Sequence, residues 1–212
     1  MKVYLVLFLS ILLVGCHSWG LKGSGNIKEE ERNIVEFSKI DISGYFKVDV
    51  KSGETTSLKI ITDDNFLPLI KTNVKGQTLE ISTKKNLDSK EPIRIEISTP
   101  HLVQLECSGA NNLNIAGIDE EQFYLEVSGA CKVRLHGSVK TFKAEMSGAT
   151  KLDAEGLHAN NVNLDVSGAS KAKVYASEVI NASGSGASYI EYYGSPKSVN
   201  TDISGAGKIE KR

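Results

Sequence analysis

The tripeptide Ser-Gly-Ala returns six times in the second half of this sequence, at intervals of 18 to 20 residues. The six copies begin at Ser108, Ser128, Ser147, Ser167, Ser185 and Ser204. A fixed period near 20 residues is typical of proteins in which one structural unit stacks on copies of itself. The repeat therefore constrains the fold more than any other feature of the chain.

Apolar residues within each repeat stand at odd distances from the serine. The position five residues before it holds Val103, Phe123, Phe142, Val162, Ile180 and Val199, and the position one residue before it holds Cys107, Val127, Met146, Val166, Gly184 and Ile203. A period of two is the period of a β-strand. We predict an all-β fold, a parallel β-helix or β-solenoid with coils of about 19–20 residues, in which each repeat holds two short strands joined at the Ser-Gly-Ala corner.

The even positions are expected to face solvent, and two of them carry charge. Two residues before the serine stand Glu106, Glu126, Glu145, Asp165, Ser183 and Asp202, and four residues after it stand Asn112, Lys132, Lys151, Lys171, Tyr189 and Lys208. The pattern favours a solvated face on which opposite charges offset each other. A linear site for a divalent cation or a basic partner is the alternative, although carboxylates in single file do not supply the six to eight oxygens that Ca²⁺ takes.

The chain begins with a targeting segment. Residues 1–15 combine Lys2 with an apolar run and predict a lipoprotein signal peptide, because the run is too short for a transmembrane helix. The sequence Leu13-Val14-Gly15-Cys16 resembles a bacterial lipobox and predicts a lipid on Cys16, which would anchor the chain to a membrane. Since residue 17 is His rather than Asp, we expect delivery to the outer membrane. Residues 16–23 are then a tether.

The rest of the chain divides into two closely joined parts. Residues 24–107 alternate less regularly and are expected to form irregular N-terminal β coils that cover the first open edge. Residues 108–212 form the Ser-Gly-Ala repeat. Between two expected strands, the segment Asp63–Ile70 predicts a turn with apolar anchors rather than a metal or catalytic site.

Several function classes are disfavoured by what the sequence lacks. The four histidines hold unrelated positions, and no serine of the repeat is set apart beside a base, so we expect neither an enzyme, a metal nor a cofactor. An enzyme acting on polysaccharides stays the least favoured alternative. A net charge of −1 gives no basic footprint for nucleic acid. Cys107 is expected to face inward, and Cys131 lies four positions away within the repeat, which disfavours a disulfide between them.

Tyrosines near the C-terminus suggest a binding surface. Tyr175 and Tyr193 share one position on successive repeats, and Tyr189 points outward on the same coil as Tyr193. Exposed tyrosines can stack on sugar rings, although a cross-strand aromatic pair that only stabilises the last coils is the simpler interpretation. Two functions stay open: a cell-envelope binding or adhesion module that recognises a glycan, and a structural protein that assembles with copies or other envelope proteins. The sequence leaves the oligomeric state open.

With these segments placed, the chain resembles the head GIN domain family, an auto-transporter adhesin domain common in Bacteroidetes. The segments Gly23-Ser24-Gly25-Asn26, Asp64-Asn65-Phe66-Leu67 and Leu79-Glu80-Ile81 and the Ser-Gly-Ala ladder carry the resemblance, which covers about residues 24–209. It implies a β-helical fold and a lipid-anchored, extracytoplasmic location. It brings no catalytic residues.

Overall fold

The computed structural model describes residues 20–212, which form an all-β structure. Its strands are β1 (Leu21–Lys22), β2 (Ile27–Glu31), β3 (Lys39–Gly44), β4 (Phe46–Ser52), β5 (Ser57–Asp63), β6 (Ile70–Lys75), β7 (Thr78–Thr83), β8 (Leu87–Asp88), β9 (Ile93–Thr99), β10 (Gln104–Gly109), β11 (Asn112–Val127), β12 (Lys132–Met146), β13 (Lys151–Val166), β14 (Lys171–Gly184), β15 (Tyr189–Tyr193), β16 (Ser198–Ile203) and β17 (Lys208–Lys211). A single short 3₁₀-helix, η1 (Leu67–Leu69), follows β5 within this described range. The predicted all-β class is confirmed, and residues 1–19 lie outside the described part of the chain.

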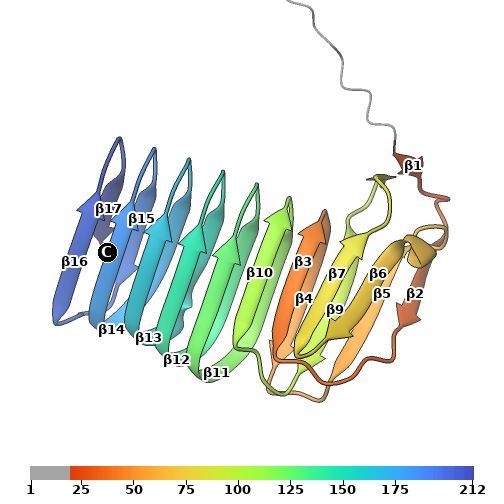
Figure 1. Cartoon of the computed structure of the whole chain (residues 1–212), viewed down its shortest axis with the longest axis horizontal. Helices are drawn as coiled ribbons and strands as arrows, with labels where there is room; N and C mark the ends of the chain where they lie inside the picture. The colour runs from red at the N-terminus through yellow and green to blue at the C-terminus, as the bar shows by residue number, and fades with distance from the viewer. Residues whose placement is uncertain (1–19) are drawn as a thin grey trace, which may run out of the picture.

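Long parallel strands make up most of one 15-stranded sheet. Strands β10, β11, β12, β13 and β14 pair in parallel, each with the strand one repeat away. Leu105, for example, lies opposite Leu125, which lies opposite Ala144. Figure 1 shows the strands side by side along the long axis, with narrow turns at one edge. Equivalent positions of successive repeats therefore stand in rows across the sheet.

The repeat is built from one bent strand rather than two short ones. The first part of β11, residues 112–116, pairs with β4. The last part of the same strand, residues 124–127, pairs with residues 104–107 of β10. The register shifts between Ile115 and Ile118, next to Gly117, whose φ is +78°. Pairing with the neighbouring strand is interrupted at this bend and resumes after it. The expectation of two separate strands in each repeat is wrong for β11–β14.

Backbone hydrogen bonds join each Ser-Gly-Ala corner to the next. The N–H of Ala149 donates to the carbonyl oxygen of Gly129 at 2.8 Å, and the same contact recurs at other corners. Gly148 has φ of +88°, and a Cβ placed there would overlap the carbonyl oxygen of Gly129. Glycine is thus required at the corner both by its left-handed backbone and by close approach of the neighbouring coil.

The N-terminal part extends the same sheet and then closes it with antiparallel strands. Strands β3 and β4 pair in parallel with β10 and β11, whereas β2, β5 and β6 run antiparallel to their neighbours. Phe66, Leu67 and Ile70 are buried, so the segment after Asp63 has the apolar anchors that the sequence predicted. Leu21 and Lys22, in the segment predicted as a tether, pair with β8.

The core lies between the two layers of the bent strands and is filled by the odd positions of the repeat. Phe123 and Phe142 stack at 6.2 Å between ring centroids, and both are almost fully buried. Cys107 and Cys131 are also buried, with their sulfur atoms 2.8 Å apart. The expectation that four positions of the repeat hold these cysteines apart is wrong. The chain reverses direction at each corner. A residue just before one corner, such as Cys107, therefore lies beside a residue just after the next corner, such as Cys131.

Candidate functional site

The outer surface of the layer that follows each corner carries a row of basic side chains. Strand pairing places eight residues in register across this layer: Arg94, Lys47, Asn112, Lys132, Lys151, Lys171, Tyr189 and Lys208. We call this row the basic file; six of its eight members are cations and none is acidic. Adjacent strands are about 4.8 Å apart, so neighbouring like charges repel by about 1 kcal/mol in water. Lys132 and Lys151 have no ion pair within residues 20–212 to offset this repulsion.

The basic file is most concentrated on β12, β13 and β14. A second row, two residues further along each strand, adds Arg134 and Lys173 to Lys132, Lys151 and Lys171. We call these five residues the basic patch. Asp153 is the one carboxylate set in register between Arg134 and Lys173, and it lies 3.7 Å from the Arg134 guanidinium. The patch therefore keeps a net positive charge on a flat β surface.

The predicted tyrosines border this patch. Tyr175 and Tyr193 are direct partners on β14 and β15, so the structure brings them side by side, and Tyr189 lies four residues before Tyr193 within the basic file. Their rings already have neighbours: the Lys171 ammonium lies 4.6 Å from the centroid of Tyr189, and Lys173 lies 5.8 Å from that of Tyr193. His158 packs edge-on against Tyr175 at 4.5 Å. All three tyrosines are half-buried, and Tyr189 and Tyr193 each have a lysine ammonium beside the ring.

A buried carboxylate holds the C-terminal end of the basic patch in place. Glu191 is only 4% exposed, and it lies 3.1 Å from the Lys171 ammonium and accepts hydrogen bonds from Nε and Nη2 of Arg212 at 3.1 and 3.0 Å. Burial opposes ionisation of Glu191, but the hydrogen bonds from Lys171 and Arg212 outweigh it and hold the pKa of the carboxyl below its usual value. The last residue of the chain is thereby tied to β15.

The opposite layer carries an acidic row. Seven of eight residues in register are acidic: Glu80, Asp41, Glu106, Glu126, Glu145, Asp165, Ser183 and Asp202. We call this row the acidic file. Burial, together with the Glu126 and Glu145 carboxylates, raises the pKa of the Tyr124 hydroxyl to about 12. Partial burial, with Glu80 and Glu126 nearby, raises the pKa of Asp41. The two outer surfaces beside the corner thus have opposite charge.

A shallow groove of about 520 Å³ crosses the acidic layer at its C-terminal end. Asn163, Asn181 and Asn200 line it and form a ladder, in which the amide of Asn200 donates to Asn181 Oδ1 and that of Asn181 to Asn163 Oδ1, both at 2.8 Å. Sequence reasoning missed this ladder. Its signal was present, because asparagine stands four residues before the serine in three of the six repeats.

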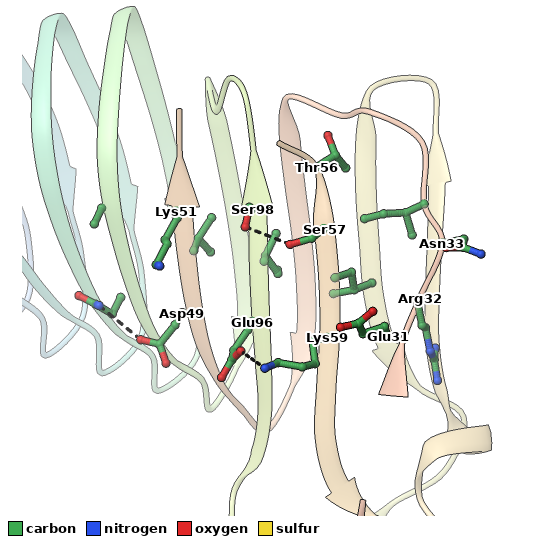
Figure 2. Close-up of a pocket in the computed structure, with 16 residues that line it drawn as sticks. Glu31, Arg32, Asn33, Asp49, Lys51, Thr56, Ser57, Lys59, Glu96 and Ser98 are labelled. Atoms are coloured by element: carbon green, nitrogen blue, oxygen red, sulfur yellow. Dashed lines mark hydrogen bonds and ion pairs between the residues drawn. The ribbon is translucent and has the colours of Figure 1, made fainter. Parts of the chain in front are cut away.

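A cleft of about 790 Å³ lies on the basic layer near the N-terminal end. Figure 2 shows that several of its polar side chains bond to one another. Lys59 Nζ lies 2.7 Å from Glu96, and the hydroxyls of Ser57 and Ser98 are 3.0 Å apart.

Metal binding and membrane crossing find no support in the residues that the structure describes. Across Gly20–Arg212 no three His, Cys, Asp or Glu side chains are grouped as metal ligands would be. The same residues contain no helix that is long and apolar enough to span a bilayer. Cys16, the predicted lipidation site, lies outside the described residues.

Comparison with known proteins finds one matching family model and several solved structures with a similar fold. Residues 36–196 match the family model described as "Putative auto-transporter adhesin, head GIN domain". None of the curated proteins matches the sequence. A crystal structure of a "putative adhesin" from Bacteroides fragilis NCTC 9343 is 23% identical, with a TM-score of 0.75, and the match covers 91% of this chain and all of that one.

Two proteins of Parabacteroides distasonis ATCC 8503 have the same fold. One, called a "putative adhesin", is 18% identical with a TM-score of 0.58, and the match covers 91% of this chain and 100% of that one. The other, called a "putative lipid binding protein", is 18% identical with a TM-score of 0.56, and the match covers 91% of this chain and 99% of that one. At these identities the structural likeness supports the fold alone.

Proposed function

This chain belongs to the head GIN domain family, and on that premise we propose that it is a non-enzymatic binding module of the cell envelope. The adhesin names of its relatives suggest an envelope-associated protein that binds rather than catalyses. A lipid on Cys16 would anchor it, and we favour the outer membrane.

We further infer that the chain is a β-solenoid with coils of about 19–20 residues. Support comes from the register of β10 to β14, in which each strand pairs with the strand one repeat away on either side. Such a solenoid presents flat surfaces on which one side-chain type recurs at every coil. A binding surface of this kind suits a linear polymer with a repeating unit of its own.

The single observation that carries the binding function is the basic file. Exposed cations recur at intervals of about 4.8 Å along it, and Lys132 and Lys151 are not neutralised by neighbours within residues 20–212. Like charges held in a row at an electrostatic cost suit a ligand of opposite charge. Tyr175, Tyr189 and Tyr193 add aromatic surface on which sugar rings can stack. We therefore propose an acidic polysaccharide as the ligand class.

The test is the affinity of the full chain for polygalacturonate, with neutral dextran as the control polymer. The Lys132→Gln/Lys151→Gln variant should bind about tenfold more weakly, because two exposed charge contacts are lost. A matched Lys140→Gln/Lys197→Gln variant removes the same charge from lysines outside the basic file and should bind like the unaltered chain. Affinity should also fall as salt rises.

Two outcomes would contradict this proposal. Equal loss of affinity in both lysine variants would show that net charge alone matters, not the basic file. Equal competition by single-stranded DNA would show a general polyanion surface rather than a glycan site. Protease digestion of intact and lysed cells, run alongside, tests whether the chain reaches the cell surface.

A second candidate function, assembly with copies of itself, is favoured by one specific observation. The acidic file and the basic file lie on opposite layers with the same spacing, so the acidic layer of one copy complements the basic layer of another. The Glu126→Lys/Glu145→Lys and Lys132→Glu/Lys151→Glu variants should each be monomeric by light scattering at low salt. Mixing them should restore association, whereas an unaltered chain that stays monomeric at low salt would exclude this function.

A further inference from the structure

Two buried cysteines meet inside the corner region, at successive turns of the repeat. Cys107 stands one residue before the first corner, and Cys131 stands three residues after the serine of the second. Their sulfur atoms are 2.8 Å apart, which is about 0.8 Å more than the length of a disulfide bond. Both side chains are at most 2% exposed, and both are free thiols in the structure.

The surroundings of the pair differentiate the two thiols. The side-chain amide of Asn111 points its Nδ2 at Cys107 Sγ at 3.5 Å and at Cys131 Sγ at 3.9 Å. The hydrogen bond from Cys107, helped by Asn111, lowers the pKa of the Cys131 thiol to about 7, while the same bond and burial raise the pKa of Cys107. In the folded chain, Cys131 is therefore the more acidic of the two thiols.

Packing alone does not require sulfur at either place. The position of Cys107 is filled in other repeats by residues such as Val127 and Val166, and that of Cys131 by Thr150 and Ser170, which are buried in the same way. Among the six repeats, cysteine stands one residue before the serine only at Cys107 and three residues after it only at Cys131, and these two residues are neighbours in space. This coincidence needs an explanation that packing does not give.

We propose that Cys107 and Cys131 form an intramolecular disulfide that links two successive coils. The oxidant is a disulfide compound such as oxidised glutathione or a disulfide-exchange protein. The thiolate of one cysteine attacks one sulfur of the oxidant and releases one thiol, and the thiolate of the other cysteine then attacks the mixed disulfide and displaces the second thiol. The two cysteines lose two electrons and two protons in total, and the oxidant gains them as two thiols. Exchange takes place before the corner region closes over the sulfur atoms.

The linkage itself is tested on the unaltered full chain, folded in the presence of oxidised glutathione. Remaining thiols are alkylated, the chain is digested without reductant, and the peptides are identified by mass spectrometry. We expect the Cys107 and Cys131 peptides to be joined, with a mass lower by two hydrogen atoms. Recovery of both as alkylated peptides, or either joined to Cys16, would overturn the proposal.

The effect on stability is tested with a matched variant. Cys107→Val/Cys131→Ser uses residues that the chain itself places at Val127 and Ser170. Since the bond closes a loop of 24 residues, reductant should lower the thermal midpoint of the oxidised unaltered chain by roughly 5–10 °C and leave that of the variant unchanged. An equal midpoint with and without reductant in the unaltered chain would count against the cross-link. Neither measurement depends on ligand binding, so the result is independent of the proposed function.

Discussion

The side-chain oxygen of Asn111 accepts a hydrogen bond of 2.9 Å from the backbone N–H of Phe46, across 65 positions of sequence. The same amide donates to the carbonyl oxygen of Ser108 at 2.7 Å. Asn111 is 2% exposed, so water does not compete for these bonds. One side chain therefore joins the start of β4, in the N-terminal half, to the first corner of the repeat.

We predict that Asn111→Ala destabilises the chain by about 1–3 kcal/mol, because the N–H of Phe46 and the carbonyl of Ser108 would be left without partners. Denaturant unfolding at neutral pH measures this. Asn112→Ala, on the exposed neighbour, should change the free energy of unfolding by less than about 0.5 kcal/mol. Equal effects of the two substitutions would show that the bridge to Phe46 carries no stability.

A pair of glycines separates backbone strain from close approach. Gly53 and Gly148 both have φ of +88°, but a Cβ at Gly53 meets nothing within 4 Å, whereas one at Gly148 overlaps the carbonyl oxygen of Gly129. Gly53→Ala should cost about 1–2 kcal/mol, for the left-handed backbone alone. Gly148→Ala should cost clearly more, about 3 kcal/mol or above, because neighbouring coils must move apart. Thermal and chemical unfolding of the two variants measures these losses. An equal loss in the free energy of unfolding would contradict the prediction.

Glu191 predicts a specific acid sensitivity. Its pKa in the folded chain lies below the ordinary value of 4.5, so its contribution to stability is fully present above pH 4.5 and is lost as the pH falls through the folded-state pKa. At pH 7, Glu191→Gln should have a lower thermal midpoint than the unaltered chain, since Lys171 and Arg212 lose their partner. The two midpoints should converge as the pH falls from about 5 towards 2.

The control for this prediction is Glu155→Gln, on an exposed side chain that has no ion pair among residues 20–212. It should keep the unaltered midpoint at pH 7. A constant difference between the Glu191→Gln variant and the unaltered chain at every pH would mean that the charge of Glu191 is not what stabilises the C-terminal strand.

The tyrosines beside the basic patch give a prediction about ligand recognition. Tyr175→Ala/Tyr193→Ala should weaken binding of polygalacturonate about tenfold, because two aromatic surfaces that can stack on sugar rings are removed. Tyr45→Ala removes a ring that is 61% exposed in the loop between β3 and β4, outside this surface, and should leave binding unchanged. Unaltered affinity in the double variant, with an unaltered fold by circular dichroism, would restrict the tyrosines to a structural role.

Sequence reasoning succeeded where the determinants are local and repeated. Alternation of apolar residues around Ser108 and its later copies predicted strands, and the spacing of the copies predicted stacking of like on like. The sequence-based prediction failed for Cys107 and Cys131, which it placed apart because they stand four positions from each other within the repeat. The chain reverses at the corner between those positions, so the two side chains meet. It also treated Lys47 and Arg94 as part of an irregular region, although strand pairing puts both in the basic file.

What the sequence determined by itself is the all-β class, the faces of the strands and the place of each corner, because a period of two and a recurring Ser-Gly-Ala are encoded within each repeat. The tertiary structure decided which residues from different coils become neighbours. The joining of Glu191 to Arg212 and the pairing of the two sulfur atoms depend on contacts between strands. So does the extension of the charged files beyond the repeat, because no recurring motif marks the register there and backbone pairing alone sets it.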